Sequence, residues 1–212
     1  MTAAGEKDVR DTILEKALPH VAFDGWTLTA LLAGARDAGL DPARAQLAFP
    51  GGEIEAVKHF SQWLDRRMLD ALAKRDLKAM KISARIAAAV MARLDLALPY
   101  REAVRRSLAV LALPLNAPVG LGCLYRTVDA MWQAAGDVST DYNFYTKRGL
   151  LAGVLSATTL YWMNDGSEGQ ADTRAFLDRR ISEVMQVPQV IGRIRAFLES
   201  LPSPFALFRR PQ

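Results

Sequence analysis

Residues that most often perform catalysis are scarce in this chain. Its 212 residues include two histidines, His20 and His59, and one cysteine, Cys123. Glu55 and His59 are four residues apart, so on a helix they would lie on one face and share a proton or a hydrogen bond. Cys123 lies in an apolar segment, where a free thiol is more often a small core residue than a nucleophile. Neither histidine lies in a Glu-x-x-His pair such as a di-iron bundle would use, so a metal role for Glu55 and His59 is not expected.

Motifs of the common enzyme classes are also missing. Gly120 and Gly122 form a Gly-x-Gly pair, but no predicted strand precedes them and the third glycine of a dinucleotide-binding loop is absent. The chain contains no Gly-x-Ser-x-Gly turn, no Walker phosphate loop and no zinc-ligand spacing. The sequence therefore predicts a protein that is not an enzyme and that holds no catalytic residues, metal or cofactor of its own.

Composition indicates a folded chain without a membrane span. Half of the residues are hydrophobic, and the formal net charge is only +4, which names no partner by itself. The ten N-terminal residues match neither a signal peptide nor a transit peptide, and a single cysteine excludes an internal disulfide. Residues 107–125 are uncharged, but Pro114 and Pro118 interrupt them, so we expect two buried helices meeting at a corner. The predicted location is cytoplasmic.

Apolar residues recur at helical spacing along nearly the whole chain, which predicts an all-α fold of about ten helices. Three short helices, ending near residue 49, are followed by longer helices at about 53–75, 81–97, 100–113, 117–135, 140–164, 171–185 and 188–201. We divide the chain into a helix-turn-helix-like unit, a helical lipid-binding bundle and a C-terminal amphipathic helix with its tail, at residues 1–76, 77–186 and 187–212.

The order of the first four helices is that of the TetR-type regulators, in which the third helix enters the DNA major groove. Residues 40–49, which contain that helix, offer one aspartate, one arginine and one glutamine. A DNA-reading helix normally supplies several contacts to phosphates and bases. A TetR-like, ligand-responsive transcriptional regulator therefore remains the alternative function, and nucleic acid is an unlikely partner.

A second uncharged segment, residues 149–163, predicts a central helix that protein or ligand must enclose. Its small residues Gly149, Gly153, Ser156 and Ala157 permit either close helix packing or room for a long apolar guest. Beside the segment 107–125, it would form the wall of a tunnel for a bound isoprenoid quinone precursor or another lipid. The predicted lipid-binding residues are Leu108, Leu111, Leu115, Val119, Leu121, Leu124, Leu150, Leu151, Val154, Leu155 and Trp162.

The C-terminal helix is amphipathic, with apolar residues at i, i+3, i+4 and i+7 and a basic polar side. Such a helix either docks onto its own core or a second subunit, or lies on an anionic membrane surface. The tail after residue 201 adds further large apolar side chains, which favours peripheral membrane binding. The predicted membrane-binding residues are Ile191, Ile194, Phe197, Leu198, Phe205, Phe208, Arg193 and Arg195.

Three stretches of this sequence resemble one known family. They are Gly25-Trp26-Thr27, the segment Leu98-Pro99-Tyr100 with the corner from Leu113 to Pro118, and the run from Met131 to Arg148, which includes Gly136-Asp137-Val138-Ser139-Thr140-Asp141-Tyr142-Asn143-Phe144-Tyr145-Thr146. The last run is highly specific, and the match continues through residues 172–185. The chain resembles the ubiquinone-biosynthesis accessory proteins of the Coq-nine family.

This resemblance implies a TetR-like homodimer that has lost DNA binding. It implies that isoprenoid lipids bind in an apolar pocket and are presented to the demethoxyubiquinone hydroxylase, a di-iron enzyme that supplies its own metal ligands. The acidic and hydroxyl side chains of residues 137–141 are also explained as caps of a helix start. Phe144 departs from the tryptophan of the family pattern, which removes one N–H donor. The implied partner-binding residues are Asp129, Met131, Trp132, Asp141, Asn143, Phe144 and Tyr145.

Overall fold

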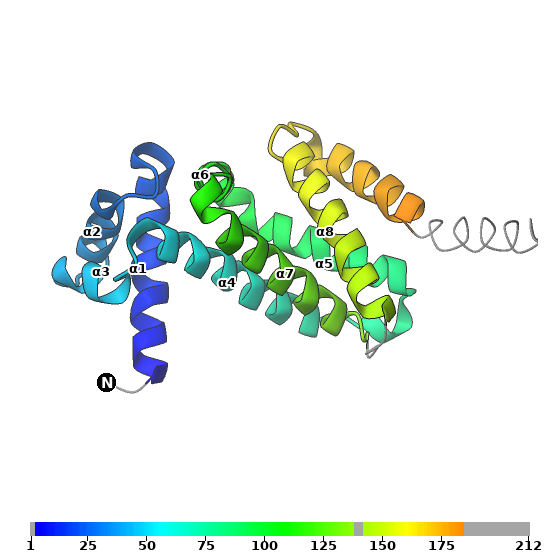
Figure 1. Cartoon of the computed structure of the whole chain (residues 1–212), viewed down its shortest axis with the longest axis horizontal. Helices are drawn as coiled ribbons and strands as arrows, with labels where there is room; N and C mark the ends of the chain where they lie inside the picture. Colours follow the sequence, from blue (N-terminus) through cyan, green and yellow to red (C-terminus); the bar gives the residue numbers. More distant parts are fainter. Residues whose placement is uncertain (1–2, 138–141, 185–212) are drawn as a thin grey trace, which may run out of the picture.

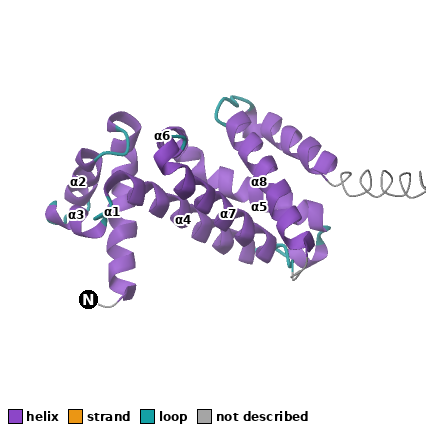
Figure 2. Cartoon of the chain, in the orientation of Figure 1, coloured by secondary structure: helices purple, strands orange, loops and turns teal. Residues whose placement is uncertain are grey.

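The structure, a computed structural model, describes residues 3–137 and 142–184, and every regular element in that part of the chain is helical (Figure 2). The prediction of an all-α fold is confirmed. The α-helices are α1 (Ala3–Asp24), α2 (Leu28–Asp37), α3 (Ala43–Ala48), α4 (Gly52–Ala73), α5 (Ile82–Ala97), α6 (Arg101–Leu111), α7 (Ala117–Ala134) and α8 (Tyr142–Trp162). Residues 171–184 form a further helix that reaches the end of the described part.

Helices α1 to α3 form a small unit at one end of the molecule (Figure 1). The predicted apolar face of α1 is buried, from Ile13 to Val21. Gly34 in α2 allows the two helices to approach closely, because a Cβ atom at this position would lie 2.7 Å from the Cβ of Ala17. The hydroxyl of Thr27 accepts a hydrogen bond from the backbone N–H of Ala30, which caps α2 as the sequence predicts.

Helix α4 belongs to both parts of the fold, since it contacts α1 as well as α5, α6 and α7. An aromatic cluster at its N-terminal half joins the two parts. The rings of Trp26 and Phe60 lie 5.3 Å apart, and the indole N–H of Trp26 donates to the carbonyl oxygen of Ala103 in α6. One continuous apolar core therefore runs from α1 to the helix at 171–184.

The apolar segment 107–125 forms a corner between α6 and α7, as the prolines predict. A short 3-10 helix, Pro114–Asn116, separates the two helices. In the described part of the chain, no single helix is long and apolar enough to cross a membrane. The segments Ile82–Leu111 and Pro114–Ala134 pass that test only together, and they meet at an angle of 96°.

Two expectations about burial are wrong. Leu115 and Leu121, from the corner and the start of α7, are 94% and 67% exposed, so this segment is not buried along its whole length. Helix α8 lies between α7 and the helix at 171–184 (Figure 1), but one of its faces is not enclosed. Gly149, Gly153 and Leu160 on one of its faces are exposed. The absence of charge in 149–163 reflects one buried face and one exposed apolar face.

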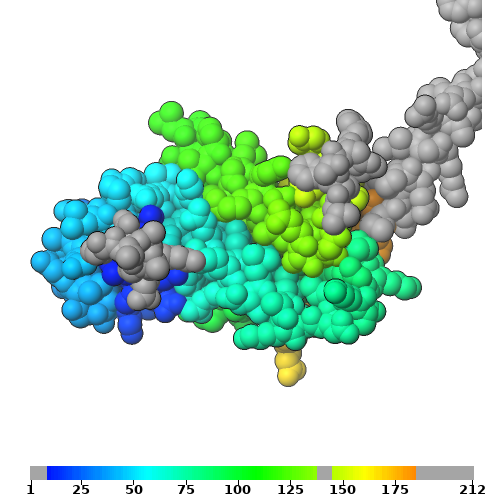
Figure 3. Space-filling view, turned by 90° about the horizontal axis from the view of Figure 1, so that it is seen from below, coloured from blue at the N-terminus to red at the C-terminus, as the bar shows by residue number. Residues whose placement is uncertain are grey.

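Figure 3 shows the same arrangement in a space-filling view, with the N-terminal unit at one end and α4, α5 and α7 across the face that is seen. Helix α8 also closes one side of a cavity within the bundle.

Candidate functional site

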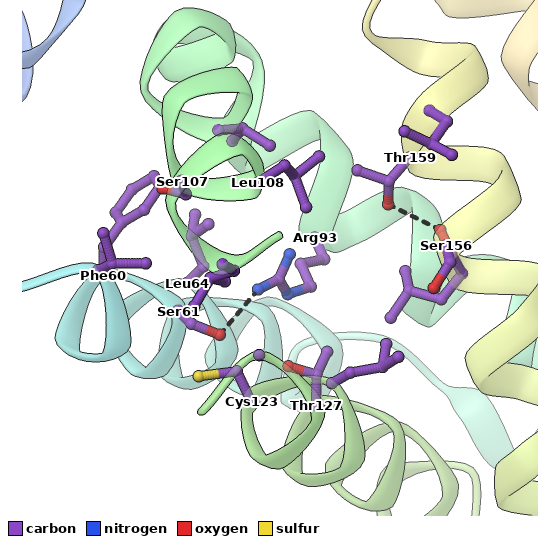
Figure 4. Close-up of a pocket in the computed structure, with 17 residues that line it drawn as sticks. Phe60, Ser61, Leu64, Arg93, Ser107, Leu108, Cys123, Thr127, Ser156 and Thr159 are labelled. Carbon is purple, nitrogen blue, oxygen red and sulfur yellow. Dashed lines mark hydrogen bonds between the residues drawn. The ribbon is translucent and has the colours of Figure 1, made fainter. Parts of the chain in front are cut away.

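A pocket of about 230 Å³ lies inside the bundle (Figure 4). Five helices contribute to it, from α4 to α8, and most of the side chains that line it are apolar. The lining residues are Val57, Phe60, Ser61, Leu64, Arg93, Val104, Ser107, Leu108, Leu111, Gly120, Cys123, Leu124, Thr127, Leu155, Ser156, Thr159 and Leu160. Mostly apolar walls with a few convergent polar groups are typical of small-molecule sites.

One charged side chain, that of Arg93, enters this apolar lining. Its Nε donates to the carboxylate of Asp65 at 2.9 Å, and its Nη2 donates to the hydroxyl of Ser61 at 3.3 Å. The hydroxyl of Thr127 donates to the same carboxylate at 2.9 Å. Asp65 is buried, so these partners compensate a charge that would otherwise be costly to remove from water.

The pocket opens between α8 and the corner that joins α6 to α7. Ser156 and Leu160 line the pocket and are exposed, with 56% of Leu160 accessible. Leu111 and Gly120 also line it, and exposed leucines lie close to each in the sequence, at Leu113 and Leu121. An apolar surface thus continues from the pocket to the outside of the molecule.

The pocket contains four of the predicted lipid-binding residues. Leu108, Leu111, Leu124 and Leu155 all line it. They come from α6, α7 and α8, which are the helices whose uncharged sequences indicated a cavity. The pocket thus adjoins the two uncharged segments, and α4 and α5 complete its wall.

The other predicted lipid-binding residues lie elsewhere. Leu115 and Leu121 are exposed, because they follow the corner on its outer side. Val119 and Leu150 are half-buried, and Leu151 and Val154 are buried in the core. Trp162 is fully buried, and its indole N–H donates to Gln170. Helical periodicity cannot separate a residue that packs in the core from one that lines a cavity.

Arg93 and the lining residues from α4 were missed by the sequence analysis. A usable signal for Arg93 existed, since it is the one charged residue between Ala87 and Leu94 in a helix rich in alanine. No comparable signal distinguishes Phe60 or Leu64 from their core neighbours. Their place in the pocket depends on how α4 packs against α7, which is a tertiary contact.

The residues of the implied partner patch differ in exposure. Tyr145 is 69% exposed, and Trp132 is half-buried with its indole N–H donating to the carbonyl oxygen of Lys147. Met131 is fully buried, so in this conformation it belongs to the core and not to a surface. Asp129 accepts hydrogen bonds from the buried Arg148.

The remaining residues of that patch are outside the described part. Asp141 lies in the undescribed segment 138–141, and the side chains of Asn143 and Phe144 are likewise outside the description. The predicted membrane-binding residues from 187 onward also fall outside the described residues. The roles of these residues stay predictions.

The candidate acid–base pair does not form. Glu55 accepts hydrogen bonds from Arg10 and from the backbone N–H of Gly51, whereas His59 bonds to Asp11 at 2.7 Å. Burial lowers the pKa of His59, and the positive charge of Arg10 lowers it further. No group of three or more metal-ligating side chains occurs among residues 3–137 and 142–184.

The surface that corresponds to a DNA-reading helix is small. Helix α3 spans six residues, and its exposed side chains include Arg44, Gln46 and Leu47. Leu47 is 76% exposed and has no polar atom to offer to a phosphate or a base edge. The exposed side chains of α3 therefore supply few of the contacts to phosphates and bases that DNA recognition needs.

Helix order and pocket together define a class, an all-α protein of TetR-like fold with an apolar pocket in its bundle. The TetR transcriptional regulator from Nitrosomonas europaea ATCC 19718 matches with a TM-score of 0.68 over 83% of this chain and 97% of that one. The two sequences are 22% identical, so the likeness concerns the fold alone.

Sequence similarity identifies the family. A family model described as COQ9 matches residues 117–188. Ubiquinone biosynthesis protein COQ9-B, mitochondrial, from Xenopus laevis is 35% identical over 204 residues, covering 92% of this chain and 69% of that protein. COQ9 of Rattus norvegicus is 35% identical over 203 residues, and this chain spans 65% of its length. The chain belongs to the COQ9 family, which confirms the predicted resemblance.

Proposed function

We propose that this protein acts in ubiquinone biosynthesis as a non-enzymatic lipid carrier. In this proposal it binds an isoprenoid quinone precursor, or a related lipid, in the pocket between α4 and α8. The observation that carries the proposal is the apolar pocket itself, in a chain whose relatives are named for ubiquinone biosynthesis. Its volume of about 230 Å³ lies below the usual range for whole ligands, which suits one end of a long lipid.

The rest of such a lipid would lie along the exposed leucines outside the pocket. Leu113, Leu121 and Leu160 provide an apolar surface there, and covering apolar area from water contributes about 25 cal/mol per Å². A molecule taken from a bilayer gains little of this energy, because its tail already lies in hydrocarbon. The protein would therefore collect its ligand at a membrane surface.

A blocked pocket tests this proposal. Ser156→Trp places a large side chain at the exposed edge of the pocket, and Gly149→Trp places the same side chain about two helical turns away on α8. Each protein is incubated with decylubiquinone vesicles, re-purified, extracted with solvent and analysed by mass spectrometry. Wild type and Gly149→Trp should retain the quinone, and Ser156→Trp should lose it. Wild-type protein without lipid would contradict the proposal.

We further propose that α7 and α8 present the lipid to the di-iron hydroxylase through the surface around Tyr145. The 69% exposure of this aromatic side chain supports the proposal, since exposed aromatics are frequent anchors of interfaces. Tyr145→Ala should weaken hydroxylase pull-down by at least tenfold with little change in melting temperature. Tyr125→Ala, at another exposed tyrosine, is the matched control and should bind normally.

Peripheral membrane binding by residues 187–212 completes the proposal and rests on the amphipathic sequence pattern. Deletion of these residues should abolish flotation with anionic liposomes. Unchanged flotation would assign membrane binding to another surface. The TetR-like regulator remains the second candidate because of the fold match alone. A salt-dependent mobility shift with DNA would favour it.

A further inference from the structure

The lining of the pocket is uneven in polarity, and its one charged group is Arg93. Figure 4 shows the guanidinium among the lining side chains of α4, α6 and α7, with its bond to Ser61 drawn. The side chain of Arg93 is 13% exposed, so most of its surroundings are protein atoms of the bundle.

Two of the three guanidinium nitrogens of Arg93 are occupied within the protein. Nε bonds to Asp65, and Nη2 bonds to Ser61. Among the residues that the structure describes, the third nitrogen, Nη1, has no hydrogen-bond partner. An arginine carries donors on each of these nitrogens, so Nη1 keeps N–H groups to offer to a molecule in the pocket.

The charge of Arg93 is already balanced on the protein side. Its Nε is 2.9 Å from the Asp65 carboxylate, and Arg126 approaches that carboxylate more loosely, at 3.7 Å. Arg126 is not among the lining residues, and its side chain is 35% exposed. The cluster of Arg93, Asp65 and Arg126 carries a formal charge of +1, but the excess lies on the partly exposed Arg126, where solvent screens it. A ligand in the pocket therefore meets an Arg93 that is paired with Asp65 and still has a donor. The positive charge of Arg93 is largely used by Asp65, so it would not fully offset the cost of removing an anionic ligand from water.

We propose that Arg93 selects the ligand, accepting an uncharged oxygen-bearing ring such as a quinone or phenol and placing that oxygen against Nη1. This inference rests on the proposed lipid-binding function and adds the chemistry of the bound end. The oxygenated ring enters the pocket, and the hydrocarbon tail leaves past Ser156 and Leu160. Ligands with an anionic end, or with no oxygen at all, bind more weakly.

Three probes with the same ten-carbon chain test the proposal: decylubiquinone, decylbenzene and decanoate. Equilibrium dialysis against the full-length protein gives the Kd of each. Arg93→Lys keeps the positive charge beside Asp65 but loses the branched donors, so the Kd of decylubiquinone should rise about tenfold while that of decylbenzene changes less than twofold. Arg105→Lys makes the same change at an exposed site outside the pocket. It should alter neither the Kd of decylubiquinone nor that of decylbenzene.

A double variant, Asp65→Leu with Arg93→Leu, replaces the buried ion pair by hydrocarbon and provides a second reading if Arg93→Lys folds poorly. It should lose the preference for decylubiquinone over decylbenzene. If the variants lost affinity equally for decylubiquinone and decylbenzene, Arg93 would have no selective role, while the carrier function would stand. Tighter binding of decanoate than of decylubiquinone by the wild type would overturn the preference for uncharged ligands. Wild-type protein that binds none of the probes would overturn the carrier function itself.

Discussion

Arg148 of α8 and Asp129 of α7 form an ion pair, with Nη2 2.6 Å from one carboxylate oxygen and Nε also donating to it at 2.7 Å. Arg148 is 4% exposed, and Asp137 approaches the same guanidinium at 3.4 Å. Asp129 was predicted to contact the hydroxylase. In the structure its ion pair with Arg148 joins α7 to α8.

Asp129→Ala should therefore lower stability by about 2 kcal/mol, because the buried arginine loses charge-assisted hydrogen bonds to Asp129 while Asp137 stays beside it. Thermal unfolding followed by circular dichroism would measure the change. Asp178→Ala, at an exposed aspartate of the helix at 171–184, should shift the melting temperature little. Should Asp129→Ala lose hydroxylase binding at an unchanged melting temperature, Asp129 would be a direct contact instead.

The buried His59 should make stability depend on pH below neutrality. Burial and the charge of Arg10 lower its pKa from the ordinary 6.5, so the unfolded chain takes up a proton first as the pH falls. This contribution to stability is complete above about pH 6.5 and is lost as the pH falls toward the folded-state pKa, by at most about 1.4 kcal/mol per pH unit. His59→Gln should flatten the melting temperature between pH 7.5 and 5.5. An unchanged slope would assign the pH dependence to other groups.

Gly34 should tolerate no side chain. Gly34→Ala would place a methyl group 2.7 Å from the Cβ of Ala17 and from the carbonyl oxygen of Ile13, so α1 and α2 must separate. Overpacking of this kind costs about 1–3 kcal/mol. Gly122→Ala in α7 is the matched control, because no atom lies within 4 Å of its added methyl, and it should stabilise by about 0.5–1 kcal/mol. Chemical denaturation would rank the two variants.

Asp165 should stabilise the start of the helix at 171–184 in a pH-dependent way. Burial alone would raise its pKa, but hydrogen bonds donated by Ser167 and Thr173 outweigh burial and hold the pKa well below its ordinary value. Asp165→Asn should cost about 1–2 kcal/mol at pH 7. The difference in free energy of unfolding between wild type and Asp165→Asn is complete above about pH 4 and shrinks as the pH falls further.

Melting curves of wild type and Asp165→Asn at pH 7 and pH 3 would test this prediction. Glu168→Gln, at an exposed carboxylate in the same turn, serves as the control for a general loss of charge. An advantage of equal size at both pH values would show that the carboxylate acts through shape and not through charge.

Most of the helices were predictable from the sequence because helical periodicity and capping are local. The predicted helix at 81–97 and its observed counterpart, α5, differ by one residue at one end. The turn before α2 was equally predictable, since Thr27 caps it as expected. Such features depend on neighbours within a few residues, which the sequence displays directly.

The exposure of side chains was harder to predict. Leu121 and Leu124 occupy the same uncharged segment, yet Leu121 is largely exposed and Leu124 lines the pocket. Their difference depends on the direction in which α7 leaves the corner at Pro114. The role of Arg93 was missed for a related reason, since a charge in an apolar helix has meaning only once its partner Asp65, 28 residues earlier, is known.

Phe60 stands between two environments. One part of this ring lines the pocket, and the Trp26 ring lies 5.3 Å away toward the N-terminal unit. Under the proposed carrier function, a ligand in the pocket would contact Phe60 and so alter the surroundings of the Trp26 ring. The intrinsic tryptophan fluorescence should then change when a ligand binds, since the rings of Trp26 and Trp63 both lie against Phe60.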